Sequence, residues 1–267
     1  AAERPEDVIF CLKSDMTEEL LREADVFLGN LESPGQLEKT EHLKWIQLNN
    51  AGTEGYCVPG RLPQGAVLTN ATGAYGLAIS EHMLACLFML RKKLNLYYAN
   101  QLQCQWKSEG HVGVIQGTTV LVIGLGDIGT CFASKMKALG CTTIGVKRRV
   151  GEKPDCVDGL YGMEELDSLL PRADVVALSL PGNPSTYHTL NRERISLLSP
   201  NAIVLNVGRG TAVDTDALSD ALYAGKIAGA ALDVTDPEPL PADHPLWKAP
   251  NAIITCLLYT SDAADEE

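Results

Sequence analysis

Residues 118–147 constrain the fold of this 267-residue chain more than any other stretch. They read TTVLVIGLGDIGTCFASKMKALGCTTIGVK, and their apolar, β-branched start at 119–123 suits a buried strand. Three glycines follow with G-x-G-x-x-G spacing: Gly124, Gly126 and Gly129. Apolar residues then recur at helical spacing up to Gly140, where a helix would end, and a second apolar run fills 143–146. The stretch therefore predicts a strand, a glycine turn, a helix and a second strand.

The glycine turn of such a unit suits a dinucleotide. Gly124 permits the tight turn, Gly126 lets a pyrophosphate approach the backbone, and Gly129 lets the helix lie close to the strand. The amides of Asp127 and Ile128 would face an anion, because they lie at the positive end of the helix. A bare G-x-G-x-x-G also occurs in ordinary turns, but the complete βαβ context favours dinucleotide binding.

The residues after the second strand indicate which dinucleotide is bound. NAD sites usually carry an acidic residue about 20 positions on, which accepts a hydrogen bond from the ribose 2′-hydroxyl. Here Lys147, Arg148 and Arg149 follow the strand, and the next carboxylate is Glu152. Three cations would attract a 2′-phosphate, so we expect NADP to be preferred, with NAD as the second choice. The alternative is a solvated basic loop.

Composition excludes several other classes of protein. A net charge of −12 argues against a nucleic-acid binder and against binding to anionic lipid. The eight cysteines form no C-x-x-C pair and the five histidines show no metal-ligand spacing, so we expect reduced thiols, a cytoplasmic setting and no metal. The most apolar run, residues 83–90, is too short to span a membrane.

Strands and helices alternate along the whole chain, which predicts an α/β fold with two Rossmann-like, doubly wound parallel-sheet domains. We expect a substrate domain at residues 1–99 and an NAD(P)-binding domain at residues 100–255. In the first domain, strands are expected at 7–12, 25–29, 44–48 and 67–69, and helices at 17–24, 34–42 and 77–98. In the second, strands beyond the glycine turn are expected at 174–180, 202–207, 229–234 and 252–255.

The long helix expected at 77–98 is apolar on all sides from Met83 to Leu90. Such a segment must be covered on all sides, either between domains or between subunits. We favour a homodimer formed through this helix.

Three loops at predicted strand ends carry candidate substrate and catalytic residues. The amides of Ala51, Gly52 and Thr53 would hold a carboxylate, unless this is a plain turn. Arg209, between two glycines, can offer a fork of donors to a carboxylate or carbonyl, or simply form a surface ion pair. Asp233 could accept from a nicotinamide carboxamide and Glu238 could orient a general acid, although acidic loop residues are often only solvated.

Five motifs together resemble the D-isomer-specific 2-hydroxyacid dehydrogenases, and the glyoxylate/hydroxypyruvate reductases among them. They are NATGAYG (70–76), GLGDIG (124–129), LNVGRG (205–210), GAALDVTDPEPLP (229–241) and HPLW (244–247). They occur in the family's order and spacing through almost all of residues 7–255. The resemblance implies two Rossmann-like domains that close on cofactor and substrate, with hydride transfer from the nicotinamide to a small 2-keto acid.

The resemblance also implies roles for individual residues. Arg209 would bind the substrate carboxylate and carbonyl, and Glu238 would pair with a proton-donating histidine. Asp233 would hold the carboxamide, and the amides around Gly52 the substrate carboxylate. Further cofactor-binding residues would be Leu180, Pro181, Val207 and Gly208. The family commonly has an acidic residue where Lys147 stands, which supports NADP.

The chain departs from the family after Thr255. There the family continues with a proline and the catalytic histidine, whereas this chain has Cys256 and Leu257. Residues 256–266 resemble a translated sequencing adaptor, so we expect a gene fragment truncated at both ends, with an incomplete substrate domain and a non-native tail at 256–267. His244 is a poor substitute for the missing acid, so the fragment is expected to be inactive.

Two other functions fit the same fold. A dinucleotide-sensing interaction module would bind the cofactor without catalysis, but such a module does not need both Arg209 and Glu238. A formate or phosphite dehydrogenase would need substrate-loop residues other than NNAGTEGY (49–56).

Overall fold

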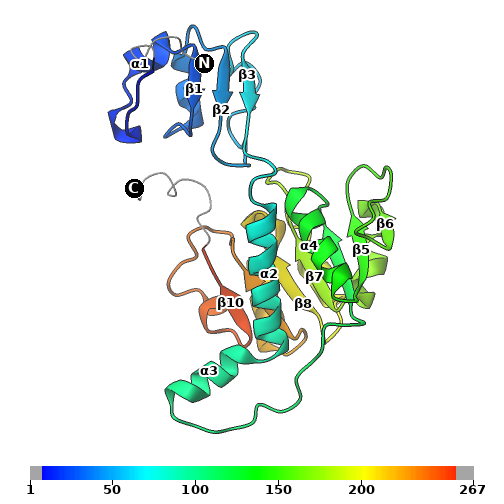
Figure 1. Ribbon diagram of the computed structural model, residues 1–267. Helices are drawn as coiled ribbons and strands as arrows, with labels where there is room; N and C mark the ends of the chain where they lie inside the picture. The colour runs from blue at the N-terminus through cyan, green and yellow to red at the C-terminus, as the bar shows by residue number, and fades with distance from the viewer. Residues whose placement is uncertain (1–7, 257–267) are drawn as a thin grey trace. The chain divides into compact units, whose positions relative to one another are not determined.

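A computed structural model describes residues 8–256, and these form two compact units that divide between Gly73 and Ala74 (Figure 1). The expected domain boundary near residue 99 differs from this division. The helix α2 (Gly76–Arg91) belongs to the larger unit, because it packs on the helix α4 (Asp127–Ala138) and on strands of the larger sheet. The expected non-native tail lies outside the described residues, apart from Cys256.

The smaller unit contains a parallel three-stranded sheet in the order β1 (Val26–Leu28), β2 (Trp45–Gln47), β3 (Val67–Thr69). The helix α1 (Glu18–Glu23) precedes it, within the expected range 17–24, and the side chain of Thr17 caps this helix by accepting from the amide of Leu20. The core of the unit is formed by leucines, Ile46 and Tyr56.

Two expectations for the smaller unit are wrong. Residues 8–12 form no strand, and no described strand pairs with them; their side chains, including Phe10, are exposed rather than packed on a sheet. The segment expected to be a helix at 34–42 is a 3₁₀ helix, Pro34–Lys39, capped by Ser33.

The larger unit is built on a parallel seven-stranded sheet in the order β10-β9-β8-β7-β4-β5-β6. The bounds are β4 Thr119–Ile123, β5 Thr142–Val146, β6 Gly159–Tyr161, β7 Val175–Leu178, β8 Ile203–Asn206, β9 Gly229–Leu232 and β10 Ala252–Ile254. Only β6 was not predicted. The strand order reverses between β4 and β7, so a crevice for a ligand is expected at the carboxyl ends of these two strands.

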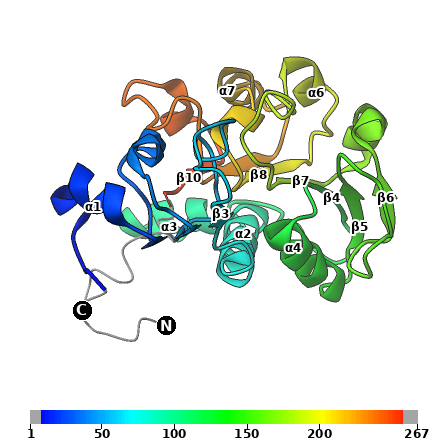
Figure 2. The ribbon, with the colours of Figure 1, turned by 90° about the horizontal axis from the view of Figure 1, so that it is seen from above.

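Helices cover both faces of this sheet, which confirms the doubly wound fold (Figure 2). Val120 and Val122 of β4 pack with α2 and α4 on one face. Leu121 and Ile123 point to the other face, in the core formed with α5 (Leu166–Leu169), α6 (Arg192–Ser196) and α7 (Thr215–Tyr223). The alternation follows from the two-residue period of a strand.

The long helix expected at 77–98 is interrupted. Lys93 has φ of 55°, which ends α2 and starts a second helix, α3 (Leu94–Leu102). Met83 and Leu87 of α2 are buried in the core of their own unit, and only part of the helix surface, including Met89, is exposed. Its own unit therefore covers much of this segment, and the homodimer contact through this helix stays a prediction. No helix within residues 8–256 is both long and apolar enough to cross a membrane.

Candidate functional site

The glycine turn connects β4 to α4 at the carboxyl edge of the seven-stranded sheet. Gly124 has φ of 96°, and a β-carbon there would lie 2.7 Å from the carbonyl oxygen of Ser179. The hydroxyl of Ser179 donates to the carbonyl oxygen of Gly124 at 2.8 Å. The turn is therefore packed against the segment that follows β7, at the point where the strand order reverses.

The other two glycines have different surroundings. A β-carbon at Gly129 would overlap the carbonyl oxygen of Gly124, so this glycine lets α4 begin directly against the turn. At Gly126 a β-carbon would meet nothing within 4 Å. The first amides of α4, those of Asp127 and Ile128, have no acceptor within the helix. Open space at Gly126 beside these amides fits a pyrophosphate.

The carboxylate of Asp127 lies against the start of α2. A β-carbon at Gly76 would be 2.5 Å from Oδ1 of Asp127. Gly76, the last residue of the NATGAYG motif, therefore leaves the space that this side chain occupies. The contact joins two motifs that are far apart in the sequence.

The three cations follow β5, whose last residue pairs with the last residue of β4. Lys147 is partly buried, and Arg148 and Arg149 are exposed. Among the residues that the structure describes, none of the three forms an ion pair. The cluster thus lies at the strand end next to the glycine turn and is available to an anionic group.

The side chain of Asn206, at the end of β8, shapes the next loop. It is fully buried; its Nδ2 donates to the carbonyl oxygen of Arg209 at 3.0 Å, and its Oδ1 accepts from the amide of Gly208 at 3.1 Å. A β-carbon at Gly208 would lie 2.5 Å from the amide nitrogen of Leu180, so the loops after β7 and β8 touch. Predicted cofactor residues from both loops, Leu180, Val207 and Gly208, are thereby brought together, and Pro181 follows in the chain.

Arg209 is partly exposed, and its Nη1 donates to the carbonyl oxygen of Gly208 at 2.8 Å. The next residue, Gly210, packs so closely on the loop after β9 that a β-carbon would overlap the carbonyl oxygen of Thr235. That loop carries Glu238, which is exposed. The structure therefore joins the loops of the two predicted catalytic residues through their backbones.

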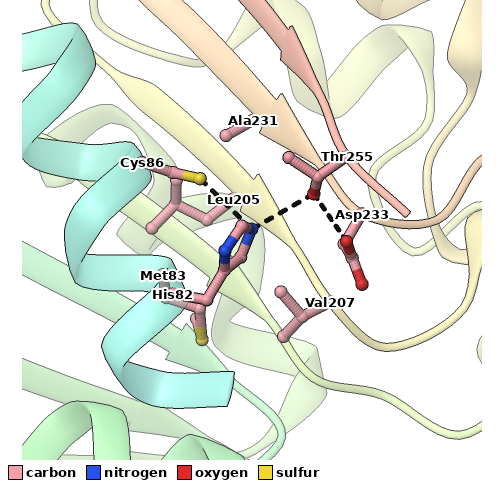
Figure 3. Close-up of a pocket in the computed structure, with 8 residues that line it drawn as sticks. All are labelled: His82, Met83, Cys86, Leu205, Val207, Ala231, Asp233 and Thr255. Atoms are coloured by element: carbon pink, nitrogen blue, oxygen red, sulfur yellow. Dashed lines mark hydrogen bonds between the residues drawn. The ribbon is translucent and has the colours of Figure 1, made fainter. Parts of the chain in front are cut away.

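Asp233 and Thr255 follow neighbouring strands, β9 and β10, at the same edge of the sheet. The hydroxyl of Thr255 donates to Oδ1 of Asp233 at 2.5 Å, and Nε2 of His82 lies 3.1 Å from the same hydroxyl (Figure 3). His82 is on α2, one turn before Cys86, whose sulfur lies 3.3 Å from Nε2.

These side chains line a pocket that holds about 190 Å³ of empty space, part of it open to solvent. Its lining residues are His82, Met83, Cys86, Leu205, Val207, Ala231, Asp233 and Thr255. Burial, and secondarily the charge of Asp233, raises the pKa of the Cys86 thiol to about 11, so this cysteine stays protonated near neutral pH.

Sequence reasoning identified Asp233 but missed the partners His82, Cys86 and Thr255. The signal available was the i, i+4 spacing of His82 and Cys86, which places both on one face of a helix. Within residues 8–256, no group of three or more His, Cys, Asp or Glu side chains could hold a metal ion.

The predicted carboxylate-binding turn lies in the smaller unit, after β2. The side chain of Asn70 donates to the carbonyl oxygen of Ala51 at 2.6 Å, and the amide of Ala71 donates to the carbonyl of Asn50 at 3.0 Å. In the hydrogen bonds described for residues 8–256, the amides of Ala51, Gly52 and Thr53 are not used as donors. The turn is held by its carbonyls and leaves its amides for a ligand.

Comparison with known proteins agrees with this arrangement. Residues 84–257 match the family model described as "D-isomer specific 2-hydroxyacid dehydrogenase, NAD binding domain". The chain is 33% identical over 240 residues to an uncharacterized protein in the proB 3′ region of Corynebacterium melassecola, covering 88% of this chain and 78% of the relative. It is 29% identical over 260 residues to a glyoxylate reductase of Thermofilum pendens, covering 94% and 71% respectively.

Solved structures show the same fold. A D-isomer-specific 2-hydroxyacid dehydrogenase family protein from Aeromonas salmonicida is 36% identical, with a TM-score of 0.78 and coverage of 89% of this chain and 76% of that one. A family member from Xanthobacter autotrophicus, in complex with NADPH and MES, is 28% identical, with a TM-score of 0.79 and coverage of 90% and 75%. A D-lactate dehydrogenase from Aquifex aeolicus, complexed with NAD and lactic acid, is 26% identical, with a TM-score of 0.78 and coverage of 94% and 82%. The chain belongs to the D-isomer-specific 2-hydroxyacid dehydrogenase family.

Proposed function

We propose that this chain is an NADP-preferring reductase of small 2-keto acids, of the glyoxylate or hydroxypyruvate type. The observation that carries the proposal is the open space at Gly126 next to the three cations at Lys147, Arg148 and Arg149. A pyrophosphate would be held by the amides at the start of α4, and a 2′-phosphate by the cations. NAD, which lacks that phosphate, would bind more weakly.

The remaining roles follow from the chemistry of the side chains. When bound, the nicotinamide cofactor supplies a hydride. Asp233 would accept a hydrogen bond from the carboxamide, which fixes the face of the ring. Arg209 would bind the carboxylate and polarise the carbonyl of the acid, since a guanidinium offers two donors in one plane. The amides of Ala51, Gly52 and Thr53 would bind the substrate carboxylate.

Proton transfer is the step in which this chain is expected to be poor. Glu238 would orient a histidine, but Leu257 occupies the position where the family resemblance implies that histidine. General acid–base help contributes about 10² to 10⁴ in rate. We therefore propose that the 267-residue chain binds the cofactor but turns over slowly.

The relatives support the proposed type of substrate and the use of a nicotinamide cofactor, both at a coarser level. The glyoxylate reductase of Thermofilum pendens aligns with 94% of this chain. Among the structural neighbours, one holds NADPH and another holds NAD, so a nicotinamide cofactor is common to both. The proposed preference of this chain for NADP therefore rests on its own three cations.

Titration with NADPH and NADH, followed by cofactor fluorescence, tests the binding proposal. We expect NADPH to bind more tightly than NADH. Equal affinities would show that the three cations do not bind a 2′-phosphate. If neither cofactor binds, the proposed function is overturned. Turnover is then measured with glyoxylate and hydroxypyruvate in the chain and in its Cys256→Pro/Leu257→His variant. The variant is expected to gain about 10²-fold or more in kcat, whereas fast turnover by the unmodified chain would contradict the missing-donor proposal.

We also propose a homodimer in a cytoplasmic setting. Exposed apolar side chains continue from α2 along α3 and beyond it: Leu94, Tyr98, Leu102 and Trp106. The eight free cysteines support a reducing compartment. Light scattering of the purified chain tests the dimer, and Leu102→Glu should shift it to a monomer.

A further inference from the structure

We propose that His82 is a positioning residue for the nicotinamide end of the cofactor site. Acting through the hydroxyl of Thr255, it holds the carboxylate of Asp233 in the orientation that receives the carboxamide (Figure 3). This inference rests on the proposed function, in which Asp233 binds the carboxamide. We call the three side chains the Asp233 relay.

The fold brings the relay together from three distant segments. Leu232 of β9 pairs with Ile254 of β10, so the residues that follow them, Asp233 and Thr255, lie side by side. The amide of Thr255 donates to the carbonyl oxygen of Leu232 at 3.0 Å, and this bond continues the parallel ladder past the end of β10. α2 packs on β8 and β9, which places His82 beside this pair.

The protons of the relay can be assigned from its geometry. An ionised carboxylate only accepts hydrogen bonds, so the single proton of the Thr255 hydroxyl must point at Oδ1 of Asp233. The oxygen of Thr255 can then only accept from Nε2 of His82, 3.1 Å away. Nε2 must therefore carry a hydrogen, and the imidazole is either the Nε2–H tautomer or the imidazolium.

Cys86 is compatible with this assignment. Its sulfur lies 3.3 Å from the same Nε2. Nε2 carries only one hydrogen, and because sulfur is the weaker acceptor, this hydrogen goes to the oxygen of Thr255 and the sulfur lies beside the bond. The thiol stays protonated near neutral pH and adds no charge to the relay.

The surroundings of the relay make its hydrogen bonds important. Met83, Leu205, Val207 and Ala231 line the same pocket and surround the polar atoms in part. His82, Asp233 and Thr255 are each partly buried. In such a setting a polar network is more strongly coupled, and loss of one member leaves the others unsatisfied. The bond from Thr255 holds Oδ1 of Asp233, and each carboxylate oxygen can accept from more than one donor.

Two pairs of variants test the relay by its effect on cofactor binding. Thr255→Val removes the hydroxyl at constant shape, and Thr255→Ser keeps it. His82→Phe removes the donor, and His82→Gln retains an amide donor near the position of Nε2. We expect the Thr255→Val and His82→Phe proteins to bind NADPH about tenfold more weakly, as for loss of a hydrogen bond to a charged group. The Thr255→Ser and His82→Gln proteins should bind like the unmodified chain.

A cofactor analogue separates positioning from folding. In the 3-acetylpyridine analogue of the cofactor, a methyl ketone replaces the carboxamide, so no N–H is left for Asp233. The two disruptive variants should lose no affinity for this analogue. If they lose affinity for analogue and natural cofactor equally, the residues are merely structural and the proposal is overturned, even if the proposed function stands.

A measurement without cofactor checks the relay itself. Nitrogen-15 shifts of the His82 ring should report a hydrogen on Nε2, and Thr255→Val should change the Nε2 shift while Thr255→Ser preserves it. A ring protonated only at Nδ1 would overturn the relay. If the unmodified chain binds neither NADPH nor NADH, the proposed function fails and the positioning role fails with it. If the unmodified chain binds the cofactor but the disruptive variants lose affinity for cofactor and analogue equally, only the positioning role fails.

Discussion

The glycine turn and the Asp233 relay lie at the same edge of one sheet but are built in opposite ways. The turn is built mainly from backbone, which packs closely because Gly124 and Gly129 have no β-carbons, and the hydroxyl of Ser179 donates to one of its carbonyls. The relay consists of side chains that bond in series, His82, Thr255 and Asp233. One region is specified within six consecutive residues, whereas the other draws on three segments that meet only in the folded chain.

The difference teaches where each region is vulnerable. A backbone-built turn fails when volume is added, because nothing in it can rotate away. A relay of side chains fails when a donor or acceptor is removed, because its hydrogen bonds act in series. The following predictions test this contrast.

The largest effect is expected for Gly129→Ala. Its β-carbon would overlap the carbonyl oxygen of Gly124, which is backbone and is fixed by the bond from Ser179. We expect a loss of about 4 kcal/mol or more in the free energy of unfolding, in the range of the most destabilising single substitutions. Urea denaturation followed by circular dichroism measures it. Gly126→Ala is the matched control, since its β-carbon meets nothing within 4 Å, and equal losses in the two variants would contradict the contrast.

Next in size is the effect of Gly126→Val on cofactor binding. A β-carbon at this position meets nothing within 4 Å, and the methyl groups of valine would fill the space assigned to the pyrophosphate. We expect NADPH affinity to fall about 100-fold, which corresponds to about 2.7 kcal/mol, with little change in the melting temperature. Isothermal titration calorimetry measures the affinity and a thermal scan measures the melting temperature. Retained affinity would show that the phosphates bind elsewhere.

Much of the fold could be predicted from sequence because local signals agree with it. The βαβ unit and all the strands of the larger sheet except β6 occur as expected. The failures have non-local causes. β6 has only three residues and gains its partner from β5, and residues 8–12 have a strand-like pattern but no neighbouring strand among the described residues.

The candidate site divides in the same way. The glycines, the cations and Arg209 could be found because each lies in a contiguous motif. His82 and Thr255 could not, since their relation depends on the register of β9 with β10 and on how α2 packs. The burial of Met83 and Leu87 by their own sheet was also invisible, because an apolar helix looks the same whichever surface covers it.

A smaller effect is expected for the cation cluster. Replacing Lys147 and Arg148 with serine removes two charges near the assigned 2′-phosphate and should weaken NADPH binding about tenfold, or about 1.4 kcal/mol. NADH binding should not change, so the ratio of the two affinities is the measurement. Low ionic strength enlarges the effect, because the exposed arginine is screened by salt. Equal losses of affinity for NADPH and NADH would show that the cluster does not bind the 2′-phosphate and is only a solvated basic loop.

The smallest effect concerns Cys86, in the pocket of the relay. Its folded pKa of about 11 exceeds the ordinary value of 9.0, so the bound proton stabilises the folded chain at all pH values below 9 and this contribution is lost as the pH rises toward 11. By pH 10 the loss is about 1 kcal/mol. Urea denaturation at pH 8 and pH 10 measures it against Cys86→Ala, which should lose correspondingly less stability over that interval. The comparison is needed because burial also raises the pKa of Cys141, which contributes with the same sign in both proteins. If the variant and the unmodified chain lose stability equally, the pocket is wetter than its apolar lining implies, and the relay would work in water rather than in a protected site.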